Sequence, residues 1–104
     1  MKRFDLYGWR SMPLAAAADL IARAVGVEFE LHDSGYHGGD YYRSKCFGSE
    51  EILVQDNFED EEGYLAEPNF PEHHTLVYIN GASEKVARVL ADVEDLEPLR
   101  SELI

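Results

Sequence analysis

Residues 3–31 read RFDLYGWRSMPLAAAADLIARAVGVEFEL, and this stretch decides the fold class. Side chains of different kinds alternate over 3–9, which is typical of a β-strand. An alanine-rich run follows over 14–25, with its apolar residues at helical spacing. Alternation returns over 27–32, so a second strand is expected after the helix. A strand, a helix and a strand within 29 residues indicate a protein that mixes both kinds of element.

The rest of the chain continues this pattern. A turn-rich loop is predicted over 33–40, followed by strands over 41–47 and 50–56. A further strand is predicted over 75–79, and a last helix over 84–95, where apolar residues again recur at helical spacing. The expected order is therefore strand, helix, four more strands, the last two of which are joined by one long loop, and a helix.

Residues at the predicted helix ends support these boundaries. Ser11 is expected to cap the first helix, and Pro13 suits its first turn. Gly26 is expected to end that helix in a left-handed conformation. Ser83 is expected to cap the last helix, and Pro98 interrupts its pattern.

Two helices with one apolar stripe each are expected to cover the same face of one sheet. The prediction is an α+β two-layer sandwich in which a mostly antiparallel sheet of about five strands carries two helices on one face, a ferredoxin-like variant. The whole chain, 1–104, is read as one domain. The other sheet face would then lack a helical cover. Trp9, Tyr42 and Tyr7 are expected to line that open face, or to be closed off there by loops or a second copy.

The net charge of the chain indicates which classes of partner are expected. The 104 residues hold 9 basic and 21 acidic side chains, a net charge of −12. Nucleic acids and anionic membranes attract clustered Lys and Arg, so neither is an expected partner. Most of the imbalance lies in 51–104, which holds 3 basic and 14 acidic residues. The single Cys46 excludes an internal disulfide and fits the reducing cytoplasm.

The long segment between the strands at 50–56 and 75–79 is the main candidate for a functional surface. Loops longer than about 12–15 residues are usually functional or disordered. This one is acidic but also holds aromatic and apolar residues, which a disordered tether would lack. We expect a packed loop that presents acids to a basic protein. The predicted partner-binding residues are Glu59, Asp60, Glu61, Glu62, Tyr64, Glu67 and Phe70.

Catalytic and metal-binding patterns are weak. His32, Asp33, His37 and Asp40 lie close in sequence, but their spacing does not match a zinc site, so no metal is expected. Cys46 lies within a predicted strand, where cysteine is usually a small buried hydrophobe. No catalytic residue and no cofactor are therefore predicted.

Several segments resemble small immunity proteins of the actinobacterial type. They are Phe29-Glu30-Leu31, Gly38-Gly39-Asp40-Tyr41-Tyr42, Glu50–Asn57, Glu67-Pro68-Asn69-Phe70-Pro71 and Leu76-Val77-Tyr78-Ile79. Such proteins belong to contact-dependent inhibition and related polymorphic toxin systems. The resemblance implies a non-enzymatic cytoplasmic inhibitor that binds a cognate toxin, often a nuclease with a basic active site. No binding residue follows from it.

Three functions remain open at this point. The first is a toxin-neutralising protein, which the acidic half, the long loop and the resemblance favour. The second is a small regulatory domain that holds an anionic metabolite on its open sheet face with Tyr42, Arg43 and Lys45. The third is a small enzyme. The identity of the toxin and the oligomeric state are left open.

Overall fold

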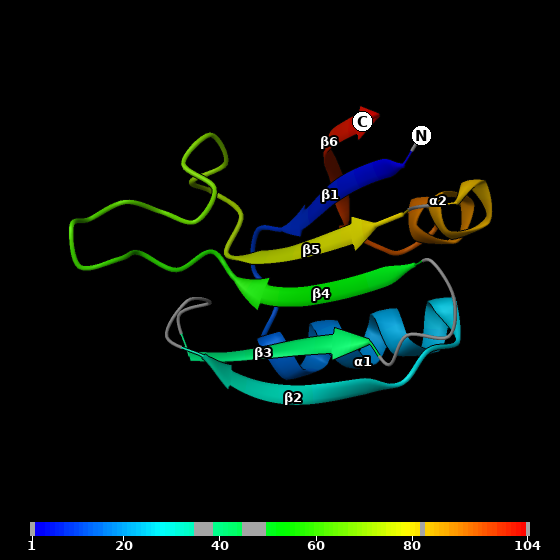
Figure 1. Cartoon of the computed structure of the whole chain (residues 1–104), viewed down its shortest axis with the longest axis horizontal. Helices are drawn as coiled ribbons and strands as arrows, with labels where there is room; N and C mark the ends of the chain where they lie inside the picture. Colours follow the sequence, from blue (N-terminus) through cyan, green and yellow to red (C-terminus); the bar gives the residue numbers. More distant parts are fainter. Residues whose placement is uncertain (1, 35–38, 45–49, 82, 104) are drawn as a thin grey trace.

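The computed structural model shows one antiparallel sheet with two helices (Figure 1). It describes residues 2–34, 39–44, 50–81 and 83–103. The elements are β1 (Arg3–Trp9), α1 (Leu14–Val25), β2 (Phe29–Ser34), β3 (Gly39–Ser44), β4 (Glu51–Asp56), β5 (Thr75–Asn80), α2 (Glu84–Ala91) and β6 (Glu97–Leu103). The predicted α+β class is confirmed.

The sheet has six strands in the order β2-β3-β4-β5-β1-β6, and every neighbouring pair is antiparallel. The expectation of about five strands missed β6, because Pro98 in the sequence indicates only the end of a helical pattern. Proline is tolerated in an edge strand, where its missing N–H is not needed by a second neighbour. β1 is therefore an interior strand, with β5 on one side and β6 on the other.

Both helices pack on the same face of the sheet, as predicted. Ala17 and Ile21 of α1 belong to one buried cluster with Val86 and Leu90 of α2. The cluster also contains strand residues such as Val77. In Figure 1 α1 lies behind β3 and α2 lies at the right-hand end of the sheet, so the viewer faces the helix-free side. Apolar burial between one helical layer and one sheet layer is the main stabilising contribution to this fold.

The expected place of three aromatic residues was wrong. Trp9 is only 1% exposed and Tyr7 is 7% exposed, and both belong to the core beneath the helices. Tyr42 packs against the same core. The indole Nε1 of Trp9 donates a hydrogen bond to the backbone oxygen of Glu94, 3.0 Å away. A large ring with one polar atom can be buried when that atom finds a partner, so the aromatics face the helices and not the open side.

Most of the predicted element ends are close to the observed ones. Gly26 has φ 79° at the end of α1, as expected. Ser83 caps α2 by accepting a hydrogen bond from the Val86 amide at 3.3 Å. Ser11, however, is not a cap: α1 begins at Leu14, Pro13 is its N-cap residue, and no side chain caps this end.

Two elements differ in length from the prediction. α2 ends at Ala91 and not at residue 95. The chain turns there through Asp95, which has φ 63°, before β6 begins at Glu97. β2 continues to Ser34, two residues into the stretch predicted as a loop, because its pairing with β3 continues to Gly39.

Candidate protein-binding loop

The acidic segment between β4 and β5, residues 57–74, projects beyond one end of the sheet (Figure 1). Asn57 holds its base together and is itself buried. The Asn57 amide group donates to the backbone oxygens of Glu67 and Phe70 at 3.3 and 2.9 Å, and its Oδ1 accepts from the Glu67 amide at 2.9 Å. The Asn57 backbone N–H donates to the His74 oxygen at 2.8 Å. One side chain thus satisfies three backbone groups of a loop that lacks a regular ladder of its own.

The outer part of the loop is a small hairpin. Glu59 and Leu65 form an isolated antiparallel bridge. Beyond it, Asp60 closes the tip: its Oδ1 accepts hydrogen bonds from the amides of Glu62 and Tyr64, both at 2.9 Å. Gly63 adopts φ 87°, a left-handed conformation that glycine takes at low cost. Asp60 therefore shapes the turn as well as carrying charge.

The predicted charged residues lie at the surface of this hairpin. Glu59, Asp60, Glu61 and Glu62 are all exposed, and Tyr64 beside them is 64% exposed. Among the residues that the structure describes, none of these four acids takes part in an ion pair. We call this set, residues 59–62 with Tyr64, the acidic tip. Its carboxylates keep their charge available to a partner.

Glu67, by contrast, points inwards. It is 9% exposed, and its carboxylate accepts a hydrogen bond from the Tyr78 hydroxyl at 2.8 Å. The same carboxylate binds both terminal nitrogens of Arg100, at 3.1 and 3.2 Å. The prediction treated Glu67 as a surface acid like its neighbours, but here it fastens the loop to β5 and β6. A partner protein cannot reach this carboxylate without displacing Arg100.

This contact also changes the acid–base properties of its neighbours. Burial, followed by the hydrogen bond and the charge of Glu67, raises the pKa of Tyr78 well above its usual range. The hydrogen bond to Glu67 likewise raises the pKa of Arg100. Both groups are protonated at neutral pH even at their ordinary pKa values, and the shifts raise the pH at which either would lose its proton.

Phe70 is also partly used inside the protein. It is half-buried, and its ring meets the His73 ring edge-on at 6.2 Å between centroids. His73 Nε2 lies 2.7 Å from Glu97 Oε2 on β6. Arg10 then joins Glu97 to Glu72, at 3.3 and 2.9 Å. The inner half of the loop is thus fixed to β6 at two places, and Tyr64 is the more accessible of the two predicted aromatic anchors.

Comparison of the chain with protein-family models, curated proteins and solved structures gives no match. The function of the protein is therefore inferred from the geometry of this loop and from the rest of the surface.

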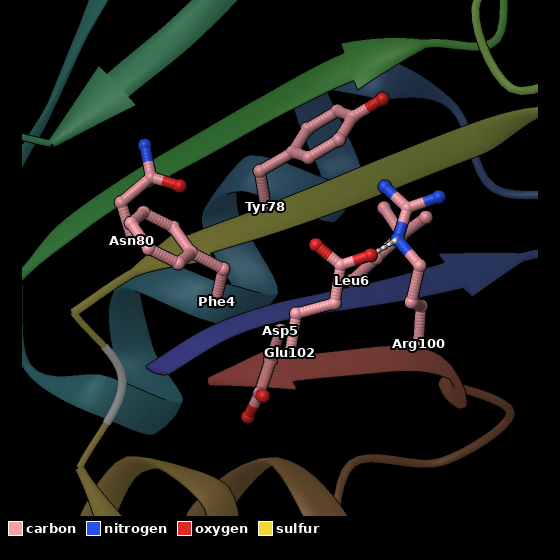
Figure 2. Close-up of a pocket in the computed structure, with 7 residues that line it drawn as sticks. All are labelled: Phe4, Asp5, Leu6, Tyr78, Asn80, Arg100 and Glu102. Carbon is pink, nitrogen blue, oxygen red and sulfur yellow. Dashed lines mark ion pairs between the residues drawn. The ribbon is translucent and has the colours of Figure 1, made fainter. Parts of the chain in front are cut away.

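A small hollow lies on the helix-free face of the sheet. Figure 2 shows that Tyr78, Arg100 and Glu102 lie on this side above Leu6, while Asp5 points away from it. The hollow that they line has a volume of about 40 Å³, which accommodates a few water molecules. Pockets for small ligands usually span hundreds of Å³. The Arg100 guanidinium in this hollow already binds Glu67 and lies near Glu102.

A wider and shallower depression of about 280 Å³ lies beside β6, bordered by Arg3, Asp5 and Tyr7. Asp5 is buried, and its Oδ1 accepts hydrogen bonds from Ser101 Oγ at 2.7 Å and Arg3 Nε at 3.0 Å. Burial, followed by the charge of Asp5, raises the pKa of Tyr7. These groups mainly bind each other, and the set has no nucleophile–histidine pair of the kind that activates a serine.

The residues predicted to hold an anionic metabolite do not converge. Tyr42 packs towards the helices, whereas the next residue, Arg43, points to the opposite face because side chains alternate along a strand. Arg43 Nη2 binds Glu51 at 2.6 Å. Lys45 lies outside the described residues.

The histidines do not form a metal centre in the described part of the chain. No group of three His, Cys, Asp or Glu side chains converges there. The His32 ring stacks on Tyr41 at 5.3 Å between centroids and lies 3.5 Å from Glu30. Two of the candidates from the sequence, His37 and Cys46, fall outside the described residues. Neither of the two described helices has the length and apolar character to cross a bilayer.

Sequence reasoning missed the residues that hold the loop in place: Asn57, His73, Tyr78, Arg100 and the capping role of Asp60. A signal existed for Asp60, because an Asp three residues before a Gly is typical of a tight turn. The other four are distant in sequence from the groups that they bind, so no local pattern indicates them.

Proposed function

We propose that this protein is a non-enzymatic acidic inhibitor that binds a cognate protein toxin through the acidic tip. The observation that supports this most directly is an ordered hairpin that holds four exposed carboxylates, none of which forms an ion pair with the described residues. The toxin would present a basic surface, such as the active site of a nuclease, which normally binds phosphates. We place this activity in the cytoplasm, where the toxin would act.

The hairpin supports the proposal because it limits the entropy lost on binding. A flexible acidic chain must be ordered when it meets a partner, and this ordering weakens affinity. Here the Glu59–Leu65 bridge and the Asp60 turn already fix the backbone. The inner contacts of Glu67 and His73 then attach the hairpin to the sheet.

Charge and aromatic contacts would serve different steps of binding. Exposed carboxylates act mainly on the rate of association, and salt screens them. Tyr64 is the aromatic residue of the acidic tip, and its exposed fraction is 64%. Aromatic residues at an interface centre often act mainly on dissociation. Tyr64 is therefore the expected anchor.

We infer further that the sheet is an extended variant of the ferredoxin-like sandwich. In the set β6-β1-β5-β4 the first strand lies between the last strand and the strand that precedes α2, as in split β-α-β units. β3 and β2 then extend this set at one edge. Because of this extension, β4 and β5, the two strands that the acidic loop joins, are both interior strands of the sheet.

The test uses charge-neutral variants that keep side-chain shape. The tip variant combines Glu59→Gln, Asp60→Asn, Glu61→Gln and Glu62→Gln, and the Asp60→Asn change retains the side-chain oxygen that caps the turn. A matched control neutralises four exposed acids elsewhere: Asp33→Asn, Asp92→Asn, Glu94→Gln and Asp95→Asn. Both variants change the net charge by the same amount.

The parent would first be used at low salt to isolate its partner from the source cells, and association would then be measured by stopped flow. The tip variant should associate at least about tenfold more slowly than the parent at low salt, with a flatter salt dependence. The control should associate nearly as fast as the parent. Equal rates for the tip variant and the parent would show that the acidic tip is not the recognition surface.

A further inference from the structure

β6 is one of the two edge strands of the sheet, and no described strand pairs with its outer side. The residues from Arg100 to Leu103 are exposed, and Leu103 is 68% exposed. An edge strand with unpaired backbone groups is a template for pairing with another strand. The edge of β6 could therefore pair with a strand whose side chains match its own.

The sequence of β6 is self-complementary. Residues 99–103 read Leu-Arg-Ser-Glu-Leu. If two such strands run antiparallel with Ser101 opposite Ser101, each Arg100 lies opposite a Glu102. We propose that β6 pairs with β6 of a second copy of this chain, and that a two-fold axis passes between the two Ser101 residues.

The backbone of β6 has the right groups on its outer side. The Arg3 oxygen accepts a hydrogen bond from the Gly81 amide at 2.9 Å, on the β5 side of β1. The N–H and C=O groups of successive residues point to opposite sides of a strand. The backbone groups of Phe4 and Leu6 therefore point towards β6. Their partners there are Glu102 and Arg100.

The amides and carbonyls of Ser101 and Leu103 consequently point outwards. The proposed register requires this, because it makes Ser101 the central residue of the hydrogen-bonded pairs. Ser101 and its counterpart would exchange two hydrogen bonds, and the outward amide of Leu103 would donate to the second strand beyond them. The register of β6 against β1 shifts between Leu6 and Tyr7, so the regular alternation holds from Arg100 to Leu103.

Arg100 and Glu102 would lie in the pairs without backbone hydrogen bonds between the two β6 strands. Side chains approach most closely in those pairs. Opposite charges in such a position stabilise a sheet.

The other edge strand, β2, lacks this match. Its residues 29–33 read Phe-Glu-Leu-His-Asp. An antiparallel pairing centred on Leu31 would place Glu30 opposite His32, but it would also place the Phe29 ring opposite the Asp33 carboxylate. An apolar ring opposite a charged group gains little from the contact and desolvates the charge. The inference therefore concerns β6 alone, and it is independent of the proposed toxin.

Two variants test the backbone and the charges separately. Leu103→Pro removes the outward amide of Leu103, whereas its control, Leu103→Val, shortens the same side chain but keeps the amide. Glu102→Arg places an arginine opposite Arg100 of the second copy. Its control, Glu61→Arg, makes the same change of charge on the acidic tip. Urea denaturation of each variant checks that the monomer fold is retained.

Sedimentation equilibrium over a range of concentrations measures the dimer. The parent should reach a mass twice that of the 11.8 kDa chain. Leu103→Pro and Glu102→Arg should each raise the dimer dissociation constant at least about tenfold, and the controls less than about threefold. Amide exchange at Ser101 and Leu103 should slow as concentration rises. A parent that stays monomeric into the millimolar range, or a dimer that both variants leave unchanged, would overturn the proposal.

Discussion

The carboxylate of Glu67 binds the guanidinium of Arg100 through two contacts, at 3.1 and 3.2 Å. Glu67 lies in the loop after β4, and Arg100 lies in β6, 33 residues further along the chain. A third contact, from the Tyr78 hydroxyl, brings β5 into the same group. This arrangement makes the position of the acidic tip depend on the last strand of the sheet.

Glu67→Gln should therefore destabilise the protein. The substitution removes the charge that holds Arg100 and leaves the half-buried Tyr78 hydroxyl with a weaker acceptor. We expect the free energy of unfolding to fall by about 1–3 kcal/mol, as measured by urea denaturation. Glu61→Gln is the matched control, because Glu61 is exposed and forms no ion pair within the described part of the chain, and it should change stability by less than about 0.5 kcal/mol. Equal stability of both variants would contradict the anchoring role of Glu67.

Gly8→Ala should also destabilise the fold, for a steric reason. A Cβ atom at Gly8 would lie 2.8 Å from Leu99 Cδ1 and 3.1 Å from His73 Cβ. Leu99 can rotate away, but the Cβ of His73 is fixed by the backbone. Overpacking of this kind usually costs about 1–3 kcal/mol, which thermal or urea unfolding would detect. In the double variant with Leu99→Ala, part of the loss should be recovered; a loss that stays the same would place the strain at His73.

The His73–Glu97 contact predicts a specific dependence of stability on acid. The hydrogen bond from His73, followed by that from Arg10, lowers the pKa of Glu97. A carboxyl group with a lowered pKa in the folded state stabilises the protein above its unfolded pKa, about 4.3. This contribution is lost as the pH falls through the folded pKa.

Glu97→Gln should therefore flatten the loss of stability between about pH 5 and pH 3, measured as urea midpoints across that range. Glu94→Gln, at an exposed position close in sequence, should retain the steep loss of the parent. A Glu97→Gln protein with the parent's slope would show that other carboxyl groups determine the acid response.

Tyr64→Ala should affect the complex with the toxin and not the fold. The side chain is largely exposed, so its removal should leave the urea midpoint nearly unchanged. If Tyr64 is the anchor, its loss should weaken binding by about 2 kcal/mol, seen mainly as faster dissociation. Tyr64→Phe should dissociate at nearly the parent rate if the ring, and not the hydroxyl, makes the contact. Biosensor measurements separate the two rates, and a parent-like dissociation rate for Tyr64→Ala would exclude an anchoring role.

The sequence predicts those parts of this structure that local patterns determine. Alternation identifies β1 and β2, short apolar runs indicate β4 and β5, and helical spacing identifies both helices. β6 escapes this reasoning since it is an exposed edge strand, with few buried side chains to create a pattern. The direction of Trp9 escapes it too, because both faces of β1 are buried and alternation alone does not say which one meets the helices.

In the candidate site, too, the sequence predicts what local patterns determine and misses what distant contacts determine. The exposure of Glu59, Glu61 and Glu62 follows from their density in the sequence, since like charges so close together remain in solvent. Glu67 differs from them only through Arg100 and Tyr78, which come from distant parts of the chain. A pattern of acids along the chain cannot distinguish a surface carboxylate from one that meets a distant arginine.

The position of β1 between β5 and β6 has a consequence for how the chain reaches this structure. The residues that pair with β1 in the sheet come from the last third of the chain: Phe4 lies opposite Asn80 and Glu102. β1 thus leaves the ribosome before β5 and β6 and cannot pair with them until they are made, while β2, β3 and β4 can form a meander earlier. Contacts of such long sequence separation are slow to form. Refolding should be limited by the docking of β1, and a chain interrupted before β5 would expose the apolar β1 to chaperones and to other chains.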